Sequence, residues 1–436
     1  MKRILMIFVL TILLAGCYKH PENEDVKIVK VKDKYNIETQ EQKVITFMHH
    51  FNQEGGIQWI VESTNLFTEK NPNALFNIQT VSSENYNKVL RQRYASGNIP
   101  DIYVLDNVLS DSFYIDCGFA VNLTDMQFIY DNIKSSALRG GKYKEKIWCL
   151  PLEINGYGVV YNRDIFTKAG IHRLPATRSE FIQACQKLSS HGVIPIAAPY
   201  KDSWTILADI YADMMQSSYL NNTDWRVGIE KGLYLWSDNF FGLNGVLERL
   251  AERSQYFNAH SFDTSWTEAT KMLAEGQAAM LINGTSAVDA VRTHNKEINI
   301  GMFAFPWSEE KGKNNFPLKT TGGLVANAKS PNVDTVIKVL EHFSTKEIGR
   351  LFQKHKKSIS VVKEINADFD PAFAELNELV KKGKKVDFSL YKPQFDNAAL
   401  NDLFTETLIR FLHDENKSVE DYVKYLDEET AKIIHN

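Results

Sequence analysis

The sequence lacks the short motifs that mark several large enzyme classes. It contains no G-x-S-x-G turn for a hydrolase nucleophile, no H-E-x-x-H zinc helix, no G-x-x-x-x-G-K-[ST] phosphate loop and no C-x-x-C pair. Acidic residues are plentiful, however, at 54 Asp plus Glu, so counting does not exclude a pair of glycosidase carboxylates. A hydrolase therefore stays open at this point.

Cysteine is also scarce. Only Cys117, Cys149 and Cys185 follow Cys17, and their spacing fits neither a disulfide framework nor a metal site, so we predict three buried thiols. The eleven His residues are scattered, and the pair His49–His50 at a strand end is more often structural than a metal ligand. We expect no metal site and no cofactor.

The chain also has no excess of positively charged residues. The chain has 50 Lys plus Arg against its 54 acidic residues, a formal net charge of -4 and a pI near 6.3. Nucleic acid phosphates demand a clustered basic surface. This balance argues against nucleic acid as a partner.

The first residues form an export signal. Lys2 and Arg3 precede an apolar run, Ile4 to Leu14, that is too short to span a bilayer. The sequence "LAGC" that ends on Cys17 resembles a bacterial lipobox, in which the cysteine thiol is diacylated and becomes the first residue; an ordinary secretory signal with a chance cysteine is the alternative. Two acyl chains hold a protein on a membrane. We predict a signal peptide over 1–17, lipidated at Cys17.

Residues 18–43 read as a flexible linker. This stretch has six Lys and six acidic residues and few large apolar ones, so it cannot bury enough surface to offset the entropy of ordering. About 390 residues remain beyond the linker, which is more than one hydrophobic core usually serves, so we expect two domains.

The folded part opens with alternating strands and helices. Strands are predicted at Val44–His50, 74–81 and 101–106, with a helix around Ile57–Phe67 and another around Tyr86–Tyr94. Such alternation implies parallel strands, and polar side chains beyond their carboxyl ends then share one rim of the sheet. That rim consists of residues at three positions: His50 to Asn52, Ser82–Ser83 and Asp106–Asn107.

Four later segments carry a resemblance to a known family. They are "PDIYVLDN", "LPLEINGYGVVYNRDIFTKAGI", "GQAAMLINGTSAV" and "GGLVANAKSPN". In this order and at this spacing, the chain from Val44 to about His355 resembles the extracellular solute-binding proteins of ABC sugar importers, the group that includes maltose-binding protein. The resemblance implies an α/β protein with a two-lobe periplasmic-binding-protein-like fold (type II), whose hinge the chain crosses three times.

Glycine- or asparagine-bearing strand junctions are the candidate crossings. They lie near Glu153–Tyr157, Leu281–Gly284 and Gly322–Ala326, although any one of them could be an ordinary turn. We therefore expect 44–154 plus 284–324 to form the first lobe and 155–283 plus 325–436 to form the second.

A sugar has an apolar face and a rim of hydroxyl groups, so its site needs aromatic planes beside placed polar groups. Tyr157, Tyr200 and Trp204 resemble the family's ligand-facing aromatic residues, and Trp236 and Trp266 come from a region where the family often has a stacking residue. Core packing is the alternative for each of these side chains.

The polar side of the site is expected from six residues. Backbone N–H groups and hydroxyls at the start of the helix after Asn283 could bind a ligand oxygen, or could only cap the helix. Where many relatives have tryptophan after the glycine of this turn, the chain has threonine, which weakens a stacking role there. The residues are Asp106, Asn155, Asn283, Thr285, Ser286 and Gly323.

The resemblance implies a receptor rather than an enzyme, with no catalytic residues. Its expected partners are a carbohydrate, the transmembrane subunits of an ABC permease, and the membrane through Cys17. The protein would act as a monomer on the outer face of the bacterial cytoplasmic membrane. A binding protein for a polyamine, an iron complex or a peptide remains an alternative, and a surface-anchored glycoside hydrolase is another.

Overall fold

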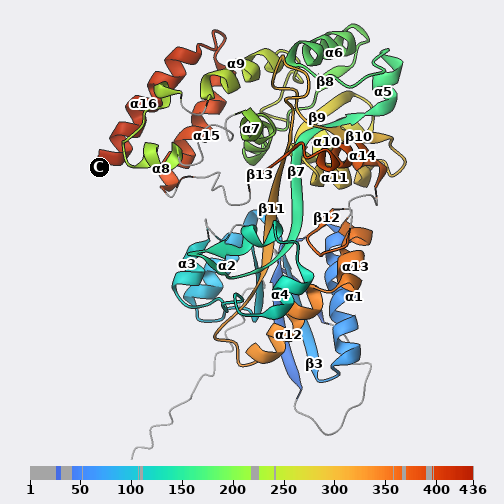
Figure 1. Cartoon of the computed structure of the whole chain (residues 1–436), viewed down its shortest axis with the longest axis vertical. Helices are drawn as coiled ribbons and strands as arrows, with labels where there is room; N and C mark the ends of the chain where they lie inside the picture. The colour runs from blue at the N-terminus through green and yellow to red at the C-terminus, as the bar shows by residue number, and fades with distance from the viewer. Residues whose placement is uncertain are drawn as a thin grey trace, which may run out of the picture.

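Two long strands join an upper and a lower lobe in the computed structural model (Figure 1). The structure describes residues 26–30, 42–51, 53–106, 108, 111–217, 225–239, 242–356, 358–365, 370–388, 395 and 397–435. The signal peptide and Cys17 lie outside these residues. Within them, no helix has both the length and the apolar character that crossing a bilayer would require.

The first lobe begins with the predicted alternation, which is confirmed. Strand β2 pairs in parallel with both β3 and β4, and helices connect the three strands. The strands are short apolar runs that are buried on most of both faces, as is usual for parallel strands covered by helices, and the helices carry their buried residues on one face. Their bounds are β2 (Lys43–His49), α1 (Glu54–Lys70), β3 (Ala74–Val81), α2 (Ser83–Ala95) and β4 (Ile102–Leu105).

Smaller elements complete this stretch of the first lobe. Cys149 follows them and is buried, as expected, whereas Cys117 is exposed just after a short helix, so the prediction of three buried thiols is wrong for Cys117. Cys185 is buried in the second lobe. The elements are α3 (Ser112–Asp116), α4 (Gln127–Asn132), the 3-10 helix η1 (Ala137–Gly141), β5 (Lys142–Tyr143) and β6 (Lys146–Ile147).

Part of the expected linker is a strand. Strand β1 (Val26–Lys30) pairs antiparallel with β3, from Val26 opposite Val81 to Lys30 opposite Asn77. The β-branched sequence of β1 favours extended backbone, and the edge of β3 offers unpaired N–H and C=O groups. The prediction that all of 18–43 is a flexible linker is therefore wrong for β1.

The hinge is a two-stranded ribbon. Strand β7 (Leu150–Asn162) pairs antiparallel with β11 (Phe316–Ala326), with Leu318 opposite Gly156 and Leu324 opposite Leu150. At one end of the ribbon β11 pairs with β4 of the first lobe, and at the other β7 pairs with β9 and β10 of the second. Two of the three expected crossings lie on these strands.

The expected crossing at 281–284 is wrong. Among the described strands, β9 (Ala278–Gly284) pairs with β7 and β8 of the second lobe and with no other, and after Gly284 the chain turns directly into α11 (Ser286–His294). The apolar face of α11 then packs into the second-lobe core beside β10 (Ile300–Phe303). Residues 284–315 therefore belong to the second lobe, because the buried face of α11 has its apolar partners there.

The expected second-lobe position of residues 325–365 is also wrong. Helices α12 (Val333–Phe343) and α13 (Lys346–Lys356) pack on α1 of the first lobe. The Trp59 ring of α1 lies 5.4 Å from that of Phe343 and 5.0 Å from that of Phe352, measured between centroids. These aromatic contacts explain why the chain stays in the first lobe after β11.

The third passage between the lobes comes later than expected. Strand β12 (Ile359–Ser360) pairs with β7 at Ile154 and Glu153, in the middle of the hinge ribbon. Residues up to 365 pack in the first-lobe core, and the chain is in the second-lobe core from 370 onward. The hinge thus has three crossings, as expected for the fold, but at β7, β11 and the segment after β12.

Helices cover the second-lobe sheet. The sheet order across both lobes is β1-β3-β2-β4-β11-β7-β9-β8, so one continuous mixed sheet runs through the hinge. The remaining elements are α5 (Arg163–Lys168), α6 (Arg178–Ser190), β8 (Ile194–Ile196), α7 (Trp204–Ser217), α8 (Trp225–Glu230), η2 (Trp236–Asp238), α9 (Leu243–Ser254), α10 (Trp266–Ala274), η3 (Pro371–Phe373), α14 (Ala374–Lys381), β13 (Lys385–Asp387), α15 (Ala398–His413) and α16 (Val419–His435).

Candidate binding cleft between the lobes

One face of the hinge ribbon carries polar side chains. Successive side chains of a strand alternate between the two faces, so Glu153, Asn155 and Tyr157 of β7 share a face. Lys319 of β11 lies directly opposite Asn155 in the antiparallel register and therefore shares that face with it.

A cleft of about 240 Å³ lies beside this face. The first lobe, the hinge ribbon and the start of α11 in the second lobe all contribute to its walls. The rim predicted at the carboxyl ends of β2, β3 and β4 is confirmed for His50, Phe51, Ser83 and Asp106, while Asn52 and Asn107 lie outside the described residues. The cleft is lined by His50, Phe51, Gln53, Ser83, Asp106, Leu152, Glu153, Ser286, Gly322, Phe352 and Lys356.

Asp106 binds a neighbour across this rim. Its Oδ1 lies 2.8 Å from Nε2 of His50, and the carboxylate remains exposed to the cleft. Loss of surrounding water would raise the pKa of Asp106, but the charge and hydrogen bond of His50 and the ammonium groups of Lys319 and Lys356 together hold it below its ordinary value. Asp106 is therefore an ionised hydrogen-bond acceptor at neutral pH.

A second carboxylate lies deeper on the hinge. An oxygen of Glu153 is 4.0 Å from Nζ of Lys356, and that ammonium group also lies 4.9 Å from the centroid of the Phe51 ring. Sequence reasoning did not single out Lys356, since it lies at the end of an ordinary amphipathic helix, α13. Only packing of α13 on α1 brings it to the cleft.

Asn155 connects the hinge to α11. Its Oδ1 accepts hydrogen bonds from the backbone N–H of Thr285 at 2.9 Å and from the Thr285 hydroxyl at 2.6 Å. A side chain at Gly284 would collide with Asn155, since an added Cβ would lie 2.8 Å from Oδ1. This contact positions the start of α11 and leaves Ser286 exposed in the cleft.

Asn283 and Thr285 themselves are buried. The Oδ1 of Asn283 accepts from the N–H of Gly284 at 2.7 Å, while its Nδ2 has no hydrogen-bond partner among the described residues. Of the predicted residues in this turn, Ser286 is thus the one whose side chain faces the cleft.

Two tryptophans, the exposed Trp204 and the half-buried Trp266, form a pair on the second lobe. The ring centroids of Trp204 and Trp266 lie 5.1 Å apart, and Trp204 is 50% exposed. Strand β8 is parallel to β9, so the segment that runs from β8 to Trp204 leaves the sheet at the same edge as Gly284. This edge faces the hinge, and an exposed indole face there suits the apolar face of a ring-shaped ligand.

Two of the other predicted aromatic residues are buried rather than exposed to a ligand. Tyr200 is 4% exposed and donates its hydroxyl to Asp209 at 2.6 Å, and Trp236 is fully buried with Nε1 donating to Thr430 at 2.8 Å. Tyr157 is half-buried, with its ring 5.8 Å from that of Tyr211.

Gly323 lies inside the first lobe rather than in the cleft. A Cβ added there would come within 2.1 Å of Sγ of Cys149, whereas Gly322, with φ of +67°, lines the cleft and has open space around it. The close approach at Gly323 is a packing requirement. We leave Gly323, Tyr200 and Trp236 out of the site proposed below.

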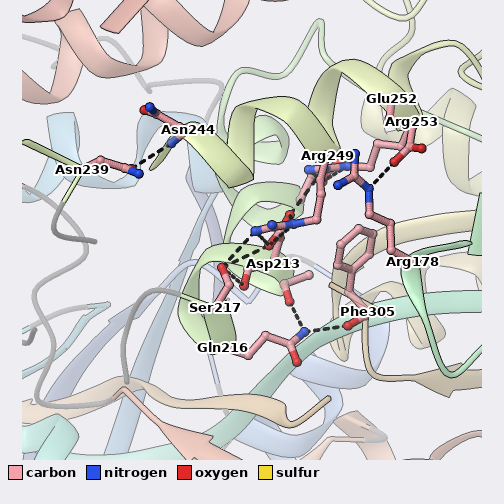
Figure 2. Close-up of polar contacts among 12 residues, drawn as sticks. Arg178, Asp213, Gln216, Ser217, Asn239, Asn244, Arg249, Glu252, Arg253 and Phe305 are labelled. Carbon is pink, nitrogen blue, oxygen red and sulfur yellow. Dashed lines mark hydrogen bonds and ion pairs between the residues drawn. The ribbon is translucent and has the colours of Figure 1, made fainter. Parts of the chain in front are cut away.

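A buried network of charges holds the Trp204 helix in place (Figure 2). In this network, Arg249 of α9 binds Asp213 of α7 with Nη2–Oδ1 at 2.7 Å, and Arg253 binds Asp209 with Nη2–Oδ1 at 2.5 Å. Gln216, at the end of α7, donates to the carbonyl of Phe305 at 2.8 Å. These contacts fix α7 against α9 and against the chain that leads into β11.

Metal ligation is not indicated by the arrangement of side chains. Among the described residues, no three His, Cys, Asp or Glu side chains are grouped as they would be around a metal ion.

Two lobes of α/β structure, a strand hinge and a polar cleft at the hinge define a two-lobe ligand-binding protein of the periplasmic-binding-protein type. The chain belongs to the bacterial extracellular solute-binding proteins, whose family model matches residues 52–349. Among curated proteins, it is 21% identical over 385 residues to the multiple sugar-binding protein of Streptococcus mutans. The alignment covers 85% of this chain and 84% of that protein.

Solved structures share the whole fold. A protein from work on xylan utilization by Caldanaerobius polysaccharolyticus aligns with a TM-score of 0.75 at 18% identity, over 89% of this chain and all of its own. RafE in complex with raffinose aligns with a TM-score of 0.72 at 16% identity, over 88% of this chain and 100% of the RafE chain. At these sequence identities, the structural comparisons show a shared fold.

Proposed function

We propose that the protein captures a carbohydrate outside the cell and delivers it to the permease of an ABC importer. The observation that carries the proposal is the Trp204–Trp266 pair, with the Trp204 ring half exposed, on the hinge-facing edge of the second lobe, together with the polar rim of the first lobe. Aromatic planes beside placed polar groups are what a saccharide requires. The sugar-related names of the relatives support the same class of ligand.

Capture proceeds by closing of the lobes. The ligand first stacks on Trp204 and Trp266, and closing then adds Asp106 and Ser83 from the first-lobe rim as hydrogen-bond partners. Because the closed form makes more contacts, the ligand shifts the equilibrium toward it by its difference in affinity for the two forms. The ribbon of β7 and β11 provides the hinge for this movement.

No catalytic step is part of this proposal. The family and its structural neighbours are binding proteins. Asp106 and Glu153, the two carboxylates that line the cleft, already contact His50 and Lys356, respectively. We propose that they orient hydroxyl groups of the ligand, and that the released saccharide is unchanged.

Titration with a saccharide panel tests the function. We expect micromolar binding of at least one saccharide, about 8 kcal/mol, with a change in tryptophan fluorescence and a smaller radius of gyration by small-angle X-ray scattering. Spermidine and ferric citrate serve as controls for the other solute classes. Binding of a control in place of every saccharide would contradict the proposal.

We also propose that Cys17 carries the lipid anchor and places the protein on the outer face of the cytoplasmic membrane, as a monomer. Mass spectrometry of the amino-terminal peptide from the membrane fraction is expected to show an acylated Cys17. The Cys17→Ala variant should appear in the medium or remain uncleaved. An unmodified Cys17 in a membrane-bound protein would contradict the anchor.

A further inference from the structure

Strand β1 meets the first lobe at the end where the cleft lies. Strands β2 and β3 are parallel and begin together, with Lys43 opposite Ala74, at the end of the lobe away from the cleft, which we call its base. Strand β1 is antiparallel to β3, so its first residue, Val26, lies opposite Val81, the last residue of β3. Ser83, just after β3, lines the cleft. The chain therefore joins the first lobe at the cleft rim before it reaches the base.

Strand β1 also lies at the edge of the sheet that is farther from the hinge. The sheet order places β3, β2 and β4 between β1 and the hinge strand β11. Lobes that swing about a hinge separate most widely on the side away from it. The start of β1 is therefore at the rim and on the side where the cleft opens.

The chain before β1 limits how far this point can lie from Cys17. Residues 18–25 separate Cys17 from β1, and a chain of this length spans at most about 28 Å. If β1 were unpaired, residues 18–42 would span up to about 88 Å and would end at the base. The base is about 23 Å from the rim along β3. Pairing of β1 thus changes both the length of the tether and the end of the lobe that it holds.

Backbone pairing keeps β1 in this position. Every residue of β1 has a partner on β3, from Val26 opposite Val81 to Lys30 opposite Asn77. Without β1, this edge of β3 would have unpaired N–H and C=O groups. Residues 31–42 connect β1 covalently to β2, so pairing is an intramolecular event with a modest entropy cost.

We propose that β1 is an orienting strand, which attaches the membrane tether at the cleft rim so that the open side of the cleft faces the bilayer. The inference rests on the lipid anchor at Cys17 proposed above and adds an orientation to it. A ligand that leaves the cleft in this orientation is released toward the membrane, where the permease of the proposed importer lies.

A matched pair of insertions tests the inference. A flexible insert of about 20 Gly and Ser residues is placed either after Asp25, before β1, or after Lys34, between β1 and β2. With β1 paired, the first insert lengthens the tether and the second does not. The second insert costs β1 little stability, because the entropy of loop closure grows slowly with length. With β1 unpaired, both inserts would lengthen the tether equally.

Energy transfer to the membrane measures the orientation. The full-length lipidated protein is reconstituted in vesicles of phosphatidylethanolamine and phosphatidylglycerol that contain a rhodamine-labelled lipid. A donor fluorophore is attached through Asn87→Cys, near the rim end of α2, or through Glu69→Cys, at the base end of α1. Both positions are exposed, and Cys117→Ser removes the exposed native thiol.

We expect at least twofold more transfer from position 87 than from position 69. The insert after Asp25 should remove this difference, and the insert after Lys34 should keep it. The Ile28→Pro/Val29→Pro variant should also remove it, because alternate residues of an edge strand donate to their neighbour and one of the two prolines therefore deletes a hydrogen bond to β3. The sugar dissociation constant should be the same in every form.

Each outcome decides the inference. Equal transfer from the two positions, or equal effects of the two inserts, overturns the orienting role of β1 while the anchor stands if mass spectrometry shows an acylated Cys17. A sugar dissociation constant that changes with the proline substitutions overturns it as well, because β1 would then act on the cleft itself. An unmodified Cys17 overturns the anchor and the inference together.

Discussion

Trp204 and Trp266 begin two different helices, yet their ring centroids lie 5.1 Å apart with the planes at 58°. The backbone N–H of Trp266 donates to Asp202 at 2.6 Å, which connects the loop before α7 to the start of α10. This hydrogen bond holds the starts of the two helices together, while half of the Trp204 side chain remains exposed to solvent.

Removing this face should weaken sugar binding. We expect Trp204→Ala to raise the dissociation constant at least tenfold, about 1.4 kcal/mol, because a stacking surface is lost while the fold is intact. Calorimetry gives the affinity and circular dichroism the fold. Tyr130→Ala, an aromatic residue 41% exposed on α4, is the matched control and should bind normally. An unchanged constant would remove Trp204 from the site.

Tyr200→Phe should affect stability rather than affinity. The substitution deletes the hydrogen bond from the buried Tyr200 hydroxyl to Asp209, which costs about 1–3 kcal/mol when the acceptor is charged. Urea unfolding measures this loss, and the sugar dissociation constant should stay the same. A tenfold weaker affinity at unchanged stability would instead place the hydroxyl in the binding site.

Asp213→Asn should be strongly destabilising. Asp213 is fully buried, and its carboxylate binds Nε and Nη2 of Arg249 at 2.9 and 2.7 Å. Neutralising it leaves buried guanidinium charge without its partner, at a cost of about 3–5 kcal/mol in the free energy of unfolding. Asp116→Asn breaks an exposed pair with Lys144 and should leave the urea midpoint almost unchanged. Equal effects of the two substitutions would contradict the proposed role of burial.

His49 should make the protein sensitive to acid. Burial, with repulsion from His50 and Lys356, lowers its pKa to about 3, so the folded protein holds His49 neutral. The unfolded chain binds this proton near pH 6.5, so the stabilisation is complete above that pH and is lost progressively as the pH falls toward 3.

The test compares urea unfolding at pH 7 and pH 5. Between these values the unaltered protein should lose about 2 kcal/mol more than the His49→Gln variant, at about 1.4 kcal/mol per pH unit. His191→Gln, an exposed position, serves as the control and should behave like the unaltered protein. An identical loss in His49→Gln would show that His49 does not titrate on unfolding.

The local elements were accessible from the sequence. The strands from Lys43 to Leu105 follow from their short apolar runs, the helices from their apolar spacing and the turn residues that end them, and the rim with His50, Ser83 and Asp106 follows from parallel pairing. Lys356 was missed, because it lies at the end of an amphipathic helix, α13, and reaches the cleft only when α13 packs on α1.

By itself, the sequence determined the order and type of the elements from β2 to β4 and the edge of the sheet where polar side chains gather, because these depend on residue patterns within short segments. Only the tertiary structure decided that residues 284–315 join the second lobe and 325–365 the first, and that Trp204 is exposed while Tyr200 and Trp236 are buried. These features depend on which distant apolar faces meet and on strand register, and free energy gained by such long-range contacts leaves no local pattern in the chain.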